Sequence, residues 1–348
     1  MTSLPAYIAR RLILLIFVIL GVSLLIFAIT TLIPIEIRAM LYVRNVQHTS
    51  PQQLIEIAKK RGLDRPIHEQ FFAWLSEVLQ GNLGFSKFSQ QPVADAILER
   101  WPYTFEIVLF AAPLIIFIGI FLGVQAAIHK DGLIDHACRV LSIIGWSLPS
   151  FWLGLLLLSV FSGYLHWVSP GPLDTNLLQF RNNPDSGFVR HTKIDLFDGL
   201  LNGRPDITLN VIQHAILPVI VIVTINVALL IRVMRSSMLE ALNKPYTVAA
   251  RAKGLDDKTV IYKHARRNAL IPVVTLSGML VAGLLGGLVI TETVFGFGGL
   301  GQWAANAALQ LDVPAVLGYA LLSAFLFVIA NLIVDILYAY IDPRIRLV

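Results

Sequence analysis

Residues whose spacing could carry chemistry are few in this chain, and the first candidate fails on its context. Gly296, Gly298 and Gly301 fit the G-x-G-x-x-G pattern of dinucleotide-binding turns. That pattern belongs to a strand–turn–helix unit followed by an acidic residue at a fixed distance, and this segment lacks both features. We therefore predict a tight re-entrant turn that leads into a short helix around Trp303–Leu309.

Motifs of nucleotide binding and of hydrolysis are missing from the sequence. There is no G-x-x-x-x-G-K-[ST] phosphate loop, no H-E-x-x-H zinc motif and no G-x-S-x-G nucleophile turn. The single cysteine, Cys138, can form no disulfide within the chain. The eight histidines have no metal-ligand spacing: they are His48, His68, His129, His136, His166, His191, His214 and His264. We predict a protein that is not an enzyme and has no cofactor or metal of its own.

Two acidic residues occur within or beside apolar runs, where an ionisable group is costly and often functional. Asp335 follows Asn331 by four residues, and Glu292 lies near the end of another run. Both acids are close to an end of their run, where they can reach interfacial water or a basic partner. We therefore expect structural roles for both, and no proton relay.

Long apolar runs must position all of these residues. Of the 348 residues, 56% are hydrophobic and 14% charged, whereas soluble domains carry about 25% charged residues. A bilayer-spanning helix needs about 20 apolar residues. Six runs qualify: Leu12–Leu32, Phe105–Ile128, Val140–Leu165, Ala215–Val233, Ile271–Ile290 and Ala315–Tyr340. The first is too long for a signal-peptide core and lacks a cleavage site. We predict an all-α integral membrane protein with six transmembrane helices.

The distribution of basic residues predicts the topology. Six spans place both termini on one side, together with the loops Ile128–Arg139 and Arg232–Asn268. These segments carry a clear excess of Lys and Arg over Asp and Glu, and the positive-inside rule assigns them to the cytoplasm. The formal net charge of +5 is explained in this way, so no nucleic-acid partner is expected.

Two outer segments are too long to be simple connections. Ser50 begins a capping box before a helix that should end at Gly62, and Pro66 opens a second, amphipathic helix. An amphipathic helix lies either on the membrane surface or against neighbouring protein. The other segment, Trp167–His214, is rich in Asp, Asn, Gly and Pro without a period. We expect irregular structure there.

Small residues recur at four-residue spacing within two of the spans. Gly119, Gly123 and Ala127 share one face of the second span, and Gly283 and Gly287 share one face of the fifth. This spacing lets helix backbones approach closely in lipid. We therefore predict that these glycines are helix-packing sites.

The cytoplasmic loop Arg232–Asn268 contains two predicted short helices. Pro245 can begin the first and Gly254 can end it, and Asp256 can cap the second, which is basic. The small residues of the first helix and the glycine turn after it could fit into a groove on a partner protein. A basic interfacial helix held on anionic lipid is the alternative. The residues alone leave both interpretations open.

A series of motifs, in order along nearly the whole chain, resembles the permease subunits of ABC importers. The run Tyr246-Thr-Val-Ala-Ala-Arg-Ala-Lys-Gly-Leu255 resembles their EAA loop, in the form found in the dipeptide, oligopeptide and nickel group. Further hallmarks of that group are Arg10-Arg11-Leu12, Gly62-Leu-Asp-Arg-Pro66, Gly81-Asn-Leu-Gly84, Leu148-Pro-Ser-Phe-Trp152, Thr291-Glu-Thr-Val-Phe295, Gly299-Leu-Gly301 and Asp342-Pro-Arg344.

The resemblance implies a type I importer permease that forms half of a translocation pathway. It further implies four kinds of partner: a second related permease, two ABC ATPases that bind ATP and Mg, an extracytoplasmic solute-binding protein and the lipid bilayer. The residues implied to seat on an ATPase are Tyr246, Ala249, Ala250, Arg251, Ala252, Lys253, Gly254 and Leu255. The glutamate that names the EAA motif is Val248 here, and the outer loop 176–206 is longer than usual.

The implied organisation is a first span with its outer loop, residues 1–103, and a core of five spans, residues 104–348, with the coupling loop at 234–270. The implied solute is a peptide, and oligosaccharides and nickel remain alternatives. A secondary transporter would need ionisable residues near mid-membrane and, typically, an internal repeat. An intramembrane enzyme would need a catalytic pair within the spans. The sequence shows neither feature.

Overall fold

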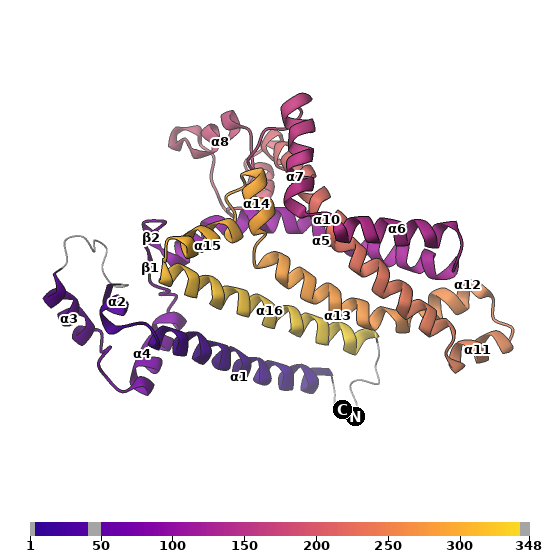
Figure 1. The fold of residues 1–348 in the computed structure, drawn as a ribbon, viewed down its shortest axis with the longest axis horizontal. Coiled ribbons are helices and arrows are strands. Elements are labelled where there is room, and N and C mark those ends of the chain that lie inside the picture. Colours follow the sequence, from indigo (N-terminus) through magenta and orange to yellow (C-terminus); the bar gives the residue numbers. More distant parts are fainter. Residues whose placement is uncertain (1–3, 41–49, 342–348) are drawn as a thin grey trace.

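The computed structural model describes residues 4–40 and 50–341, and most of these residues are helical (Figure 1). The Asp342-Pro-Arg344 motif and His48 lie outside the described residues. Among the described residues, five helical stretches are long and apolar enough to cross a membrane. They are α1 (Leu4–Thr31), α5 (Val93–Ile128), α10 (Pro205–Leu242), the stretch Asp257–Leu285 that contains α13 (Arg266–Leu285), and α16 (Val313–Ile341).

The third predicted span is not one straight helix. It consists of α6 (Leu133–Ser147) and α7 (Ser150–Leu158), and α7 continues into a π-helical turn, Ser159–Tyr164. The two parts meet at 92°, so α7 stands away from the long helices in Figure 1. Leu148, which precedes Pro149, has an extended ψ of 124°, as a residue before proline prefers. The predicted span over Val140–Leu165 is therefore a bent pair of helices, and Pro149 is the reason for the bend.

The fifth predicted span is also interrupted. α13 ends at Leu285, and Gly287 follows with a φ of +131°, a conformation that favours glycine. The chain then forms α14 (Val289–Phe295) and α15 (Leu300–Leu309), joined by a turn in which Gly296 and Gly298 both have positive φ. The prediction of a tight turn leading into a short helix is confirmed, whereas the predicted span to Ile290 ended too late.

The first outer segment folds as its capping signals predict. α3 (Pro51–Lys60) has a complete capping box at Ser50, and Gly62 follows the helix with a φ of +67°. α4 (Ile67–Leu79) begins after Pro66, and its Phe71 and Trp74 rings pack on Phe27 of α1. The short α2 (Ile35–Met40) lies beside α3. An antiparallel pair, β1 (Phe85–Ser86) and β2 (Gln91–Pro92), leads into α5 and was not predicted.

The second outer segment is more ordered than predicted. It contains α8 (Thr175–Asn182), a 3-10 turn (Pro184–Ser186) and α9 (Asp195–Leu201), and α10 begins nearly ten residues before the predicted span. A buried ion pair between Arg181 and Asp195 joins α8 to α9. The helices are only one or two turns long, so they leave no measurable period in the sequence, and the prediction of irregular structure was wrong.

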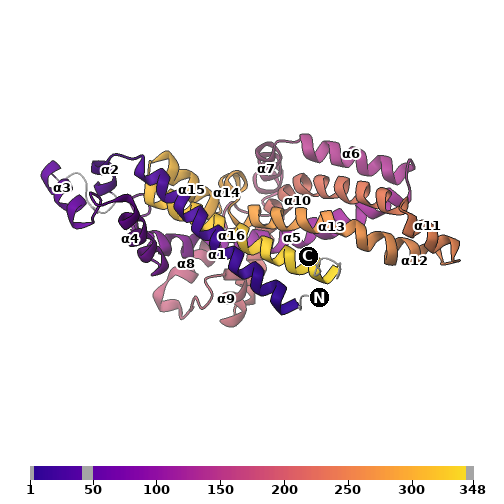
Figure 2. The ribbon, with the colours of Figure 1, turned by 90° about the horizontal axis from the view of Figure 1, so that it is seen from below.

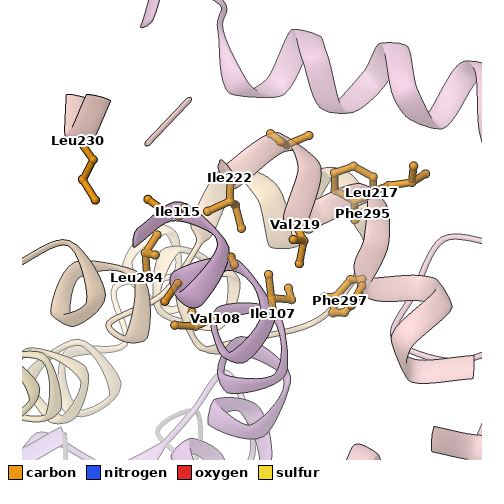
Figure 3. Close-up of a cluster of buried hydrophobic side chains, with 14 residues drawn as sticks. Ile107, Val108, Ile115, Leu217, Val219, Ile222, Leu230, Leu284, Phe295 and Phe297 are labelled. Atoms are coloured by element: carbon orange, nitrogen blue, oxygen red, sulfur yellow. The ribbon is translucent and has the colours of Figure 1, made fainter. Parts of the chain in front are cut away.

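The core lies where α5 and α10 pack side by side, closed by α13 and α14 (Figure 3). Buried aliphatic side chains of α5 and α10, such as Ile107, Ile115, Val219 and Ile222, meet Leu284 of α13 in this cluster. The other faces of the long helices keep large apolar side chains exposed, including Leu25 of α1 and Phe117 of α5. Such faces are expected of helices that contact lipid or another membrane subunit.

The two ends of the long helices carry different structures. α11 (Pro245–Ala252), α12 (Asp257–Thr259) and a π-helical turn (Val260–Ala265) lie at one end, near the first residues of α1 and the last of α16 (Figure 2). α2, α3, α4 and the β hairpin lie at the opposite end. The first residues of α1 and the last of α16 therefore lie at the same end of the long helices. An even number of membrane crossings requires this arrangement.

Candidate coupling loop and its supports

The loop that resembles the EAA motif forms a compact helix and turn. Pro245 stands at the first position of α11, where the missing N–H costs nothing. The helix ends at Lys253, and Gly254 follows with a φ of +79°. The Leu255 amide then reaches back to the Ala250 carbonyl at 3.4 Å. The predicted helix boundaries are confirmed, and Gly254 occupies a conformation that disfavours β-branched residues.

One face of α11 packs against its own chain. Thr247 is fully buried and donates a 2.7 Å hydrogen bond from Oγ1 to the Ala241 carbonyl at the end of α10. Ala250 is 7% exposed and lies on the same face. Ala250 was expected to touch a partner, but the structure turns it inward, because it follows Thr247 by three residues and shares its face. The loop is therefore anchored to α10.

The opposite face of α11 is open and partly apolar. The predicted coupling residues that are exposed in this structure are Tyr246, Ala249, Arg251, Ala252, Lys253, Gly254 and Leu255. Val248, at the position of the missing glutamate, is 55% exposed. Tyr246 and Leu255 are 40% and 41% exposed, so the three residues present apolar surface at different places on this loop. Sequence reasoning named Val248 only as a departure from the motif and missed its contribution to this surface.

The turn after α11 is held by charges. Asp256 caps α12 by accepting a 3.1 Å hydrogen bond from the Thr259 amide. Hydrogen bonding to Thr259 lowers the pKa of Asp256, so this cap is ionised at neutral pH. Arg251 of α11 lies 3.4 Å from Asp257, which adds a contact across the turn. The predicted cap is confirmed, although the helix it begins passes into a π-helical turn after one turn.

A cluster of four charged residues supports α10 just before the loop. Asp135 of α6 is fully buried and accepts hydrogen bonds from Arg235 of α10 at 2.5 and 2.7 Å. Arg139 also donates to Asp135 at 2.5 Å and to Asp131 at 2.9 Å. The cluster has no net charge, and it joins the α5–α6 turn to α10. Sequence reasoning used these residues only to assign topology.

The glycines of the second span permit close packing of α5 on α10. A Cβ added at Gly119 would lie 2.5 Å from Leu230 Cβ, and one at Gly123 would lie 2.5 Å from Met234 Cβ. Carbon atoms in contact are normally about 3.5–4.0 Å apart, so no side chain fits at either position. Leu230 and Met234 belong to the same part of α10 as Arg235, the partner of Asp135.

The glycines of the fifth span have other surroundings. No atom of the described residues lies within 4 Å of a Cβ built at Gly283, so no close helix contact is made there. Gly287 lies in the break after α13, where a Cβ would lie 2.6 Å from the Gly301 Cα. The four-residue spacing implied one helix face, but the helix ends between the two glycines. The predicted packing role at Gly283 is therefore not seen within this chain.

Glu292 has the structural role that the sequence suggested. It is fully buried and accepts hydrogen bonds from the Thr104 hydroxyl group at 2.6 Å and from the Gln302 amide at 2.8 Å. Gln302 is in the first turn of α15, which begins after Gly299 and has no side-chain cap of its own. The first amides of a helix have no acceptor within the helix, and the Glu292 carboxylate provides one for the Gln302 amide.

No group of three or more His, Cys, Asp or Glu side chains with the geometry of a metal site occurs in the described part of the chain. His214, for example, lies between the Gly171 carbonyl at 2.8 Å and Asp174 at 3.3 Å, which fixes the outer end of α10 to the loop before α8.

Two family models match the chain. The model for the inner membrane component of binding-protein-dependent transport systems matches residues 115–347, and the model for the N-terminal part of such a membrane component matches residues 4–108.

Curated relatives are similar over almost the full length. The di/tripeptide transport system permease protein of Pseudomonas aeruginosa is 40% identical over 343 residues, which are 98% of each chain. The dipeptide transport system permease protein of Escherichia coli is 37% identical over 98% of each chain. The oligopeptide transport system permease protein of Bacillus subtilis is 35% identical over 98% of this chain and 99% of the relative. This chain therefore belongs to the family of inner membrane components of binding-protein-dependent transport systems.

Proposed function

We propose that this chain is a pore-forming permease subunit of an ATP-driven importer of small peptides. The observation that carries the proposal is the exposed face of α11, which is anchored to the long helix α10 through Thr247. A partner that moves α11 would move α10, and α10 packs on α5 through the length of the core. The peptide assignment rests on relatives that are similar over almost the whole chain and are named as peptide transport system permeases.

The proposed assembly contains four kinds of protein. A second related permease completes the pathway, two ATPase subunits bind ATP and Mg in the cytoplasm, and a binding protein delivers the peptide from outside. In this arrangement the chain hydrolyses no ATP itself. The chain ends and the coupling loop 234–270 are cytoplasmic, and α2–α4 and α8–α9 are outside, as the excess of basic residues at one end favours.

The loop α11 is proposed to seat in a groove on an ATPase. Its exposed alanines, Ala249 and Ala252, allow a close approach of backbones, and Val248 and Leu255 supply apolar contact area. A helix held only on anionic lipid needs a row of basic side chains on its exposed face. α11 and its two caps have three, Lys244, Arg251 and Lys253. Lys244 contacts Glu240 and Arg251 contacts Asp257, so the protein partner is the better fit.

Peptide uptake by the assembled complex in proteoliposomes tests the proposal. The vesicles are loaded with ATP and Mg, the binding protein and a labelled di- or tripeptide are added outside, and the accumulated label is measured. We expect uptake that requires both ATP and the binding protein. The control complex has an ATPase variant that binds ATP without hydrolysing it, and it should accumulate no label.

Two results would contradict the proposal. Uptake that continues without ATP and stops when an ionophore removes the ion gradients would indicate a secondary transporter. ATP-dependent uptake of an oligosaccharide or of nickel, with none of any peptide, would keep the transport mechanism and overturn the peptide assignment.

A further inference from the structure

The two broken spans meet at one place within the membrane. α6 ends after 15 residues, or about 22 Å at 1.5 Å per residue, which is less than the roughly 30 Å of hydrocarbon. The apolar part of α13, from Leu270 to Leu285, is of similar length, about 24 Å. Both helices start at the end of the molecule that carries α11. Both breaks therefore fall inside the hydrocarbon layer.

Close contacts hold each break in place. Gly145 of α6 packs so tightly on α10 that an added Cβ would lie 2.5 Å from the Thr224 carbonyl oxygen. After the 92° bend, Gly154 of α7 packs closely on α14, since an added Cβ would lie 3.0 Å from Val294 and 3.3 Å from Phe295. The bend is therefore fixed at both ends by glycine contacts, which make it a defined feature of the fold.

A cavity of about 310 Å³ lies where these elements meet. Three polar side chains from three elements line it: Ser150 at the start of α7, Asn226 of α10 and Thr291 of α14. Val221, Ile225 and Leu288 form part of its apolar wall. Asn226 lies close to the middle of the apolar run Ala215–Val233, so the cavity is near the middle of the membrane. Its volume is within the range of about 300–1,000 Å³ that is usual for small-molecule sites.

The polar groups of this cavity are not satisfied by the described chain. Asn226 donates one hydrogen bond, from Nδ2 to the Ile222 carbonyl of its own helix at 2.8 Å. The hydroxyl groups of Ser150 and Thr291 form no hydrogen bond with any described residue. In hydrocarbon, such groups and the irregular backbone at Leu148 and Pro149 would each be costly. Irregular backbone at this depth is tolerated only when protein covers it or when it lines a water-filled space.

We infer that this cavity is part of the solute pathway, and that Ser150, Asn226 and Thr291 contact the backbone of the passing peptide. The inference rests on the proposed function and adds the residues that meet the solute. Two hydroxyl groups and an amide can both donate to and accept from peptide groups. No described residue that lines the cavity is charged, so the site recognises neutral backbone groups and does not select charged side chains. A solute that must leave again requires weak contacts of this kind.

Cysteine labelling in the assembled complex tests access to the cavity. Asn226→Cys and Ser150→Cys are made separately in a Cys138→Ala background, and a charged, water-soluble thiol reagent is applied in proteoliposomes while ATP is hydrolysed. We expect both variants to react, and we expect transported peptide to slow the reaction about threefold or more. Ile220→Cys on the same helix, 42% exposed but not part of the cavity, is the control and should not react.

Transport by a matched pair of variants tests the contact itself. Asn226→Leu keeps the side-chain size and removes the amide, and we expect a 3- to 10-fold fall in peptide uptake at normal abundance, as the loss of about one hydrogen bond implies. Thr224→Val makes a similar change two residues away, where the hydroxyl group bonds to Ile220 of its own helix. It should transport at the wild-type rate.

The outcomes separate this inference from the proposed function. Suppose that the wild-type complex transports peptide. The pathway assignment would then be overturned if Asn226→Cys and Ser150→Cys did not react, or if peptide did not change the rate of their reaction. Wild-type uptake by Asn226→Leu would overturn the contact. A wild-type complex that takes up no peptide under ATP would instead refute the proposed function, and the inference with it.

Discussion

Thr104 and Glu292 are 188 residues apart in sequence and share a 2.6 Å hydrogen bond in the core. The Thr104 oxygen also accepts a 2.9 Å hydrogen bond from the Leu300 amide. Two side chains from α5 and α14 thus satisfy the amides of the first turn of α15. This network adds polar contacts to the apolar packing of the hairpin on α5, where Leu300 and Trp303 of α15 lie in one buried cluster with Val93 and Ala96.

Replacement of Glu292 should loosen that hairpin. In Glu292→Gln one carboxylate oxygen becomes an NH₂ group, which faces a donor whichever way the amide points. We expect a loss of about 2 kcal/mol in stability, as for a buried hydrogen bond to a charged group. The measurement is thermal unfolding in detergent.

The control is Glu99→Gln on the exposed surface of α5, where the Glu99 carboxylate accepts a 2.9 Å hydrogen bond from the Gln91 side chain. This variant should unfold at the wild-type temperature. Equal stability of the two variants would show that the Thr104–Glu292 network adds nothing to the hairpin's attachment.

Local signals in the sequence predicted the short elements well. The Ser50 capping box and the positive φ of Gly254 are decided by neighbouring residues, so one sequence is enough to predict them. The bend at Pro149 could not be predicted in this way, because the residues on both sides are apolar and form one continuous run in the sequence. Apolar periodicity reports burial in lipid or protein and contains no information about direction.

Tertiary relationships explain the remaining differences. Asp135 and Arg235 are far apart in sequence, and nothing near either residue indicates that they form a pair. Ala250 resembles an exposed residue of the coupling motif, but its partner, the end of α10, is known only once the turn at Asn243 is built. The predicted coupling residues therefore lie on one loop, with Ala250 buried and the others exposed, and their contact with an ATPase stays a prediction.

The Asp135 cluster leads to a second prediction. Asp135→Ala removes the acceptor between Arg139 and Arg235 and leaves two like charges facing one buried position. Removing one partner of a fully buried pair costs about 3–5 kcal/mol, and because Arg139 is 43% exposed we expect about 2–3 kcal/mol here. Thermal unfolding in detergent measures the loss.

Asp131→Asn is the matched control, since it also removes a charge that contacts Arg139 but is 66% exposed, and asparagine tolerates the φ of +61° at this position. It should cost under about 1 kcal/mol. A similar loss in both variants would mean that the buried position of Asp135 has no special part in holding α6 to α10.

The topology makes a third prediction. Asn82 and Asn183 are exposed at the α2–α4 and α8–α9 regions, and Asp257 is exposed beside α11. In a Cys138→Ala background, Asn82→Cys and Asn183→Cys should react with an impermeant thiol reagent in intact cells. Asp257→Cys should react only after the membrane is permeabilised. Labelling of Asp257→Cys from outside would contradict the cytoplasmic position of the coupling loop.

The last prediction concerns Gly254 and the docking of the ATPase. Open space surrounds a Cβ built at Gly254, so a larger residue would meet no clash within the described chain, and the φ of +79° is the only obstacle. Gly254→Val should therefore shift the turn and the exposed face of α11, while α10 and the spans stay intact. A misplaced interface contact can cost about 2 kcal/mol, which is a roughly 30-fold weaker docking. We expect normal abundance in the membrane, poor co-purification of the ATPase and little uptake.

Gly254→Asn separates conformation from size, because asparagine tolerates positive φ far better than valine does. It should retain most of the co-purification and uptake. If Gly254→Val binds the ATPase as well as the wild type does, the turn lies outside the contact and α11 does not seat on the ATPase through this end.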